Sequence, residues 1–390
     1  MVARAAGARS ADPDVLRARF SAGLSEMYRR EVPLYGTLIE LVAAVNGRAG
    51  GTADPRLEVE RHGAIRLGTE AELRLVARVF GAMGMRAVGY YDLAAAGVPV
   101  HSTAFRPVEA AAFARSPFRV FTSLLRPELI ADPALREEAK AILSRRRIGS
   151  EELDALLERA EREGGVPEED AERFVAAAAT VFRWHETAPV TLELYQRLRA
   201  AHPLVADVVC FRGPHLNHLT PRTLDIDAAQ DAMRDAGMTP KATIEGPPRR
   251  RVPILLRQTS FQALTERVRF GDGRDGAHTA RFGEIEARGA ALTPAGRALY
   301  DRLLAQVDAA VAAGEERGAA LRDTFAAFPD DEHALREREL AFFGARSGRP
   351  LVYEDFLPVS AAGIFRSNLG GDGAKESGMA AGSRTAFEAA

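Results

Sequence analysis

Two histidine–arginine pairs with the same spacing are the residues of this sequence best suited to chemistry. His62 precedes Arg66 by four positions, and His218 precedes Arg222 in the same way. In an extended strand, residues two and four apart point to one side. Imidazole is a common ligand of transition metals, and a guanidinium binds a carboxylate through two N–H groups. Each pair alone also fits a half-buried strand with a hydrogen-bonded histidine and a surface arginine.

The segments that follow the two pairs also resemble each other. After Arg66, Thr69 is expected to cap a helix with an apolar stripe, and residues 86–93 look extended. After Arg222, a second capped helix is expected to lead to a strand at 242–245. Two copies of strand-helix-strand, each opening on a histidine, indicate a duplicated module.

A third ligand for a metal is expected from residues 283–288, where polar and apolar residues alternate. Glu284, Glu286 and Arg288 therefore share one face of a predicted strand. If that face lines the same cavity, a carboxylate meets the two imidazoles. Two histidines and one carboxylate form the triad of non-haem Fe(II) oxygenases, which leaves positions for a chelating substrate and dioxygen. The pattern leaves both glutamates open, and such a strand can also be a solvated edge.

Composition limits the class of protein. The 390 residues are 46% hydrophobic, enough for one large domain with insertions or for two domains. A net charge of -2 and the lack of a basic stripe argue against nucleic-acid binding. The single cysteine, Cys210, fits a reducing cytoplasm, and no apolar run approaches membrane-spanning length. We expect a soluble cytoplasmic protein with no membrane partner, while its oligomeric state is left open.

Helical and strand periodicities divide the chain into six parts. In order, we expect N-terminal helices at 1–56, the first module at 57–126, a helical insertion at 127–203, the second module at 204–290, C-terminal helices with a closing segment at 291–369, and a disordered tail at 370–390.

Four motifs, taken together, resemble the 2-oxoadipate dioxygenase/decarboxylase family of the vicinal-oxygen-chelate group. The resemblance spans the chain from its first helices to about Leu369, and this chain is shorter than family members between the last two motifs. The motifs, in chain order, are His62-Gly63-Ala64-Ile65-Arg66, Asn217-His218-Leu219-Thr220-Pro221-Arg222, Gly283-Glu284-Ile285-Glu286-Ala287-Arg288-Gly289 and Asp355-Phe356-Leu357-Pro358-Val359-Ser360.

The resemblance implies an α+β fold in which paired βαβββ modules form a half-barrel around a metal, with large helical insertions. It also implies that Fe(II) is held by His62, His218 and Glu286, with Glu284 as the competing carboxylate. In the family pattern the two histidines come from the first strands of the two modules. The carboxylate comes from the last strand of the second.

The resemblance further implies the substrate contacts. Arg66 is expected to take a substrate carboxylate, and Val359 and Ser360 are expected to line the substrate pocket. Arg257 is a candidate for a further contact, as are Arg222 and Arg288.

The implied reaction converts 2-oxoadipate and dioxygen into 2-hydroxyglutarate and carbon dioxide, a step of lysine breakdown. The expected partners are therefore a small 2-oxo diacid and O2. Two alternatives remain: a metal-dependent isomerase or lyase of the same superfamily, which needs no oxygen, and a non-catalytic module that binds a small acid.

Overall fold

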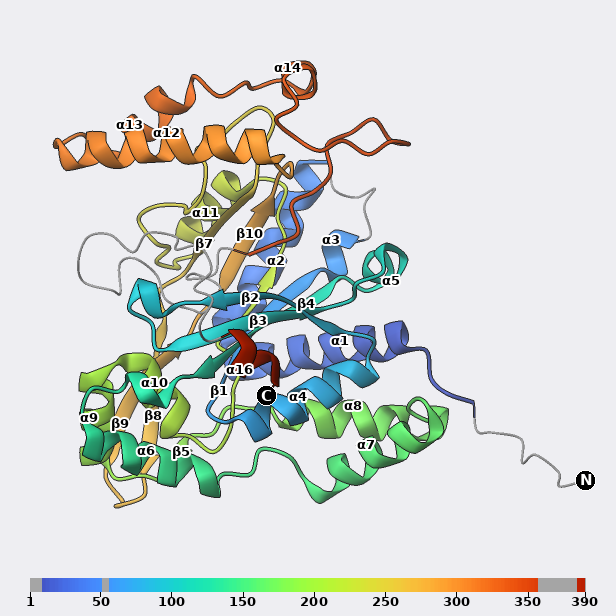
Figure 1. Cartoon of the computed structure of the whole chain (residues 1–390), viewed down its shortest axis with the longest axis vertical. Coiled ribbons are helices and arrows are strands. Elements are labelled where there is room, and N and C mark those ends of the chain that lie inside the picture. The colour runs from blue at the N-terminus through green and yellow to red at the C-terminus, as the bar shows by residue number, and fades with distance from the viewer. Residues whose placement is uncertain (1–8, 51–55, 357–383, 390) are drawn as a thin grey trace, which may run out of the picture.

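A five-stranded sheet lies at the centre of the computed structural model, which describes residues 9–50, 56–356 and 384–389 (Figure 1). The strands lie in the order β2-β3-β4-β1-β6. β1 runs parallel to β4 and antiparallel to β6. Their bounds are β1 Arg61–Leu67, β2 Arg86–Asp92, β3 Val100–Arg106, β4 Phe118–Leu125 and β6 His218–Pro221.

The first module has the expected βαβββ order. β1 and β4 are buried along their whole length, as expected for central strands covered on both faces. Between β1 and β2, helix α4 (Glu70–Ala82) begins after Thr69, whose hydroxyl accepts a hydrogen bond from the Glu72 backbone N–H. β2, β3 and β4 then follow as an antiparallel meander.

The second module begins with β6 and helix α11 (Ile226–Asp235), and continues with the antiparallel pair β7 (Leu256–Ser260) and β10 (Glu284–Arg288). A backbone bridge between Arg222 and Glu286 joins β10 to the segment that follows β6. β5 (Thr187–Ala188), β8 (Leu264–Phe270) and β9 (Asp275–Arg281) form a separate three-stranded sheet.

The strand expected at 242–245 does not form, and only an isolated bridge joins Glu245 to Gln258. Gly246 has a φ of 99°, and a Cβ at this position would lie 2.2 Å from the Leu256 carbonyl oxygen. Pro247 and Pro248 follow and cannot donate to a ladder. The tight turn therefore stops the pairing.

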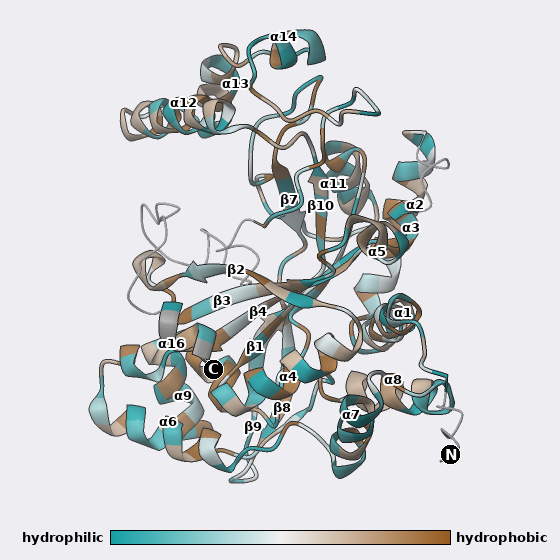
Figure 2. Cartoon of the chain, turned by 45° about the vertical axis from the view of Figure 1, so that its right-hand side comes forward, coloured by the Kyte–Doolittle hydropathy of each residue, from teal (hydrophilic) through white to brown (hydrophobic). Residues whose placement is uncertain are grey.

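Helices surround the sheets and lengthen both modules. Helices α12 to α14 form a layer at one end of the molecule (Figure 1), and Figure 2 shows apolar and polar residues interspersed along the helices. The bounds of the helices not yet given are α1 Pro13–Glu31, α2 Pro33–Arg48, α3 Arg56–Val59, α5 Ala110–Arg115, α6 Pro133–Arg145, α7 Glu151–Glu163, α8 Ala171–Thr180, α9 Leu192–Ala201, α10 Pro203–Val209, α12 Pro294–Ala312, α13 Arg317–Phe325, α14 Glu332–Glu337 and α16 Arg384–Ala389. Short 3-10 turns lie at Ala94–Ala96, Pro127–Leu129 and Glu168–Asp170.

Two of these helices lie in parts of the chain where the sequence did not predict a helix. The insertion continues into α10, past the limit set at residue 203, because Pro203 starts a new helix instead of ending one. α16 lies within the tail that was expected to be disordered, and its Phe387 packs edge-on against Tyr90 and His101. None of the helices in the described ranges has the length and apolar character that crossing a membrane requires.

An aromatic cluster ties the N-terminal helix to the first module and the insertion. Phe20 of α1 is fully buried and meets Phe80, Phe118 and Phe182 in edge-to-face contacts with centroids 5.9–6.2 Å apart. Such pairs add to the stabilisation from apolar burial. This core holds β1 and β4, and with them the site residues that they carry.

Candidate metal centre

Strand register gathers the predicted ligands on one face. Ala64 pairs with His218, and His62 pairs with Thr220, so side chains at these positions point the same way. Arg66 lies two residues beyond Ala64 on the same strand and shares this face. On β10, Glu284, Glu286 and Arg288 also share one face.

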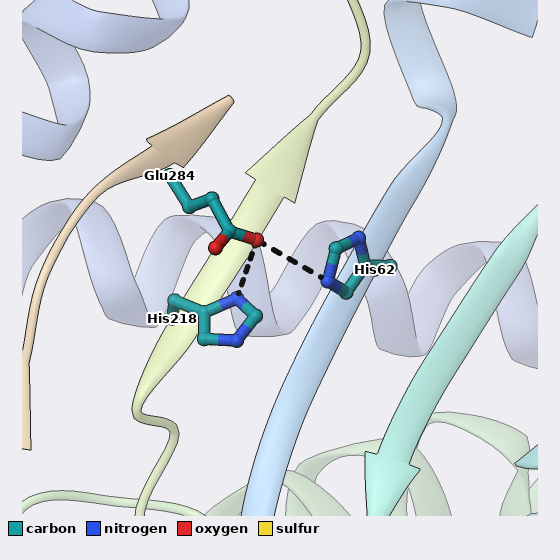
Figure 3. Close-up of side chains that lie close together, drawn as sticks. All are labelled: His62, His218 and Glu284. Carbon is teal, nitrogen blue, oxygen red and sulfur yellow. Dashed lines mark ion pairs between the residues drawn. The ribbon is translucent and has the colours of Figure 1, made fainter. Parts of the chain in front are cut away.

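His62, His218 and Glu284 form a buried cluster whose ligand atoms lie within 4.8 Å of one another. Oε1 of Glu284 is 3.4 Å from Nε2 of His62 and 3.6 Å from Nδ1 of His218. Figure 3 shows this carboxylate oxygen between the two rings, with each side chain coming from a different strand. The three side chains have no exposed surface.

The cluster fits a metal ion. Nε2 of His62 is buried and has no hydrogen-bond partner among the described residues. Burial raises the pKa of Glu284 well above its usual range, and nearby Glu286 adds to the shift. A buried polar atom without a partner is costly, as is the burial of a carboxylate's negative charge. A cation between these groups would satisfy both, and imidazole with carboxylate suits iron among other transition metals.

Glu286 lies on the other side of the His62 ring. Its Oε2 is 2.9 Å from Nδ1 of His62, and Arg288 contacts both of its oxygens at 2.7 and 3.0 Å. Burial alone would raise the pKa of Glu286, but Arg288, His62 and Arg119 hold it well below the usual range. Each ring nitrogen of His62 therefore faces a different glutamate of β10.

Arg66 meets a second buried cluster instead of the first. Its Nη1 is 2.5 Å from Oδ2 of Asp207 in α10. The other oxygen, Oδ1, is 2.8 Å from Nε2 of His278 and 3.1 Å from Nε2 of His215. Burial would raise the pKa of Asp207, but His215 and Arg66 hold it well below the usual range.

Other expected contacts are not brought to the metal cluster. Arg257 pairs in register with Ala287, on the face of β7 and β10 away from Glu286, and it binds Asp227 through two nitrogens at 2.6 and 3.1 Å. The expectation that it touches substrate therefore has no support in its position. Val359 and Ser360 lie outside the described residues.

Sequence patterns missed three residues of this region. Thr220 donates a hydrogen bond of 2.9 Å to Glu284, and its place two residues after His218 was a usable signal. Arg119 on β4 pairs in register with His62 and contacts Glu60 and Glu286. Asp207 lies on a helix, and no motif marked it.

Comparisons with known proteins agree on one family. A sequence model described as 2-oxoadipate dioxygenase/decarboxylase matches residues 20–368. The chain is 54% identical over 425 residues to a Pseudomonas putida protein of that name, covering 97% of this chain and 91% of the relative. It is 50% identical to the Escherichia coli protein of the same name, covering 98% and 94%.

Solved structures extend the likeness to three dimensions. The hydroxyglutarate synthase from Pseudomonas putida, solved in complex with 2-oxoadipate, superposes with a TM-score of 0.86 at 50% identity, covering 97% of this chain and 93% of that one. A glyoxalase-superfamily protein from Ralstonia eutropha gives a TM-score of 0.53 at 18% identity, over 74% and 89% of the two chains. The second likeness concerns the fold alone, and it confirms the expected α+β class.

Proposed function

Since the chain belongs to the 2-oxoadipate dioxygenase/decarboxylase family, we propose that it converts 2-oxoadipate and O2 into 2-hydroxyglutarate and CO2 with bound Fe(II). The observation that carries the proposal is the buried cluster of His62, His218 and a β10 glutamate on the face that also carries Arg66. It occurs in a chain that is 50% identical to a hydroxyglutarate synthase solved with 2-oxoadipate.

Two histidines and one carboxylate are proposed to hold the iron. Glu286 is the proposed third ligand because its position matches the family motif, its carboxylate is kept ionised and it touches His62. Glu284 is the second candidate, because it is the carboxylate that lies between His62 and His218. The glutamate that does not bind the metal would orient His62 through the other ring nitrogen.

The chemistry that iron supplies when bound is the activation of dioxygen beside a chelated 2-oxo acid. The reaction balances without a second oxo acid. Carbon 1 leaves as CO2, one oxygen atom of O2 enters the new carboxylate, and the other becomes the hydroxyl on the adjacent carbon. The substrate thus supplies the electrons that reduce O2.

The protein contributes position and charge. Arg66 is proposed to bind a substrate carboxylate through its planar fork of N–H groups. The backbone positions of His62 and Arg66 are roughly 13 Å apart, because they are four residues apart on one strand. A six-carbon diacid bound at the metal and the side chain of Arg66 would together bridge this distance. Thr220 orients Glu284 by its hydrogen bond, and Arg288 holds Glu286.

An oxygen electrode tests the proposed function. Protein reconstituted with Fe(II) under anaerobic conditions would be mixed with aerated 2-oxo diacids of four to seven carbons, with His218→Ala as control. We expect O2 uptake, one CO2 per O2 and formation of 2-hydroxyglutarate with the six-carbon acid. Iron-loaded protein without O2 uptake on any 2-oxo acid would support a binding module, and anaerobic turnover of an aldehyde or hemithioacetal would support an isomerase or lyase.

A further inference from the structure

Asp207 is a buried carboxylate that the proposed reaction does not use, and four side chains converge on it. It lies on α10, at the end of the helical insertion, and is 4% exposed. Arg66 and Asn217 approach Oδ2 at 2.5 and 3.4 Å, while His278 and His215 approach Oδ1 at 2.8 and 3.1 Å.

The two histidines restrain Asp207 from separate parts of the chain. Both present Nε2 to the same oxygen of an ionised carboxylate, so both are expected to carry their hydrogen on Nε2. The Nδ1 atom of His278, on β9, lies 3.0 Å from the hydroxyl of Tyr195 on α9. His215 stands three residues before His218 at the start of β6. The carboxylate is therefore fixed in one orientation.

This cluster also has the composition of a metal site, since the ligand atoms of Asp207, His215 and His278 all lie within 4.8 Å of one another. However, the guanidinium of Arg66 already forms an ion pair with Asp207 and supplies the positive charge that a cation would bring. Breaking a buried ion pair is costly because it leaves an uncompensated charge. The arrangement therefore favours a support for Arg66 over a second cation site.

We propose that Asp207 is a positioning residue that aims Arg66 at the substrate carboxylate remote from the metal, and thereby sets a preference for 2-oxo diacids over 2-oxo monoacids. The inference rests on the proposed function and assigns a role to the helical insertion. It follows from the fixed carboxylate and from the shared face of His62 and Arg66. The contact between Nη1 of Arg66 and Asp207 restrains the arginine side chain, so less conformational entropy is lost when a substrate carboxylate binds.

The test compares Asp207→Asn with wild-type protein on 2-oxoadipate and on 2-oxohexanoate, the monoacid of equal length. The readout is the ratio of kcat/KM for the two acids, which an inactive fraction of protein does not change. We expect this ratio to fall at least tenfold, with a larger rise in KM for 2-oxoadipate than loss of kcat and with unchanged iron content. An unchanged ratio in iron-loaded variant protein would overturn the proposal.

A matched control is Asp170→Asn. Asp170 is equally buried at 4% exposure, and it pairs with Arg159 at 2.7 Å and Arg173 at 3.2 Å elsewhere in the insertion. Its substitution should leave the ratio unchanged, and an equal fall in this control would overturn the proposal by showing a general effect of lost ion pairs.

A second variant covers the case in which Asp207→Asn does not fold. His278→Gln removes one restraint and keeps the Asp207–Arg66 pair, and we expect the ratio to fall about threefold; an unchanged ratio would again count against the proposal. Measurements on the wild-type protein distinguish a failure of the proposed function from a failure of the positioning role. If iron-loaded wild-type protein takes up no O2 with both acids, the proposed function is refuted; if it does take up O2, the variants test the role of Asp207.

Discussion

Glu286 and His62 are in direct contact, with Oε2 of the glutamate 2.9 Å from Nδ1 of the ring and both side chains fully buried. Glu284 faces the opposite ring nitrogen of the same histidine. Only one of the two nitrogens can bind the metal that His218 also binds, so one glutamate is a ligand and the other orients the ring. This relationship leads to the first prediction.

Substitution of the two glutamates by glutamine should separate their roles. Glutamine keeps the shape but removes the charge that a ligand supplies. We expect Glu286→Gln to weaken Fe(II) affinity by more than about 100-fold and Glu284→Gln by about tenfold, the scale of a lost supporting contact. Iron content after dialysis against a graded chelator series measures both. The reverse order would make Glu284 the ligand.

Arg66 should contribute to substrate affinity and not to metal affinity. Removing a buried two-point anchor costs on the order of 2–3 kcal/mol of binding. Arg66→Ala should therefore raise the KM for 2-oxoadipate about 30- to 150-fold while bound iron stays at the wild-type level. Parallel loss of iron would show that Arg66 instead maintains the metal cluster. Arg257→Ala is the comparison, and its KM should change little because Arg257 binds Asp227 on the other face.

His101 should make the folded state sensitive to acid. Burial, reinforced by Arg126, lowers the pKa of His101 from 6.5 to about 4. Between these two values the unfolded chain binds a proton that the folded chain does not, so stability is lost as the pH falls from 6.5 towards 4. The contribution of His101 to the free energy of unfolding should be about 2 kcal/mol lower at pH 5 than at pH 8.

Urea unfolding of His101→Gln at the two pH values measures this effect. The difference in unfolding free energy between pH 8 and pH 5 should be smaller in the variant than in the wild type. His333→Gln on α14 is the control, since the His333 side chain is 86% exposed. Equal pH dependence in the wild type and His101→Gln would contradict the prediction.

Phe20 should be a major source of stability without touching the site. It is fully buried and meets three other phenylalanines. Phe20→Ala is expected to lower the free energy of unfolding by about 3–5 kcal/mol, because it removes apolar contacts and leaves a cavity. Val15→Ala on the same helix, where Val15 is 44% exposed, should cost well under 1 kcal/mol. A small effect of Phe20→Ala in denaturant unfolding would contradict this account of the core.

The periodicity of the sequence was sufficient to predict β1 and α4, because these depend on local alternation and on a cap at Thr69. The resemblance to the family implied the α+β class, and the burial of both faces of β1 was not predicted. The same alternation correctly places Glu284 and Glu286 on one face of β10. Local patterns do not contain the distance between two strands. For this reason they left the choice between the two glutamates open.

Tertiary structure alone decided which partners these side chains meet. Arg257 faces away from the cluster because β7 pairs with β10 in a register that matches it with Ala287. Asp207 of α10 meets Arg66 of β1 although the two residues are 141 positions apart in the sequence. Such contacts arise from the packing of elements distant in the chain, and neither spacing nor composition specifies them.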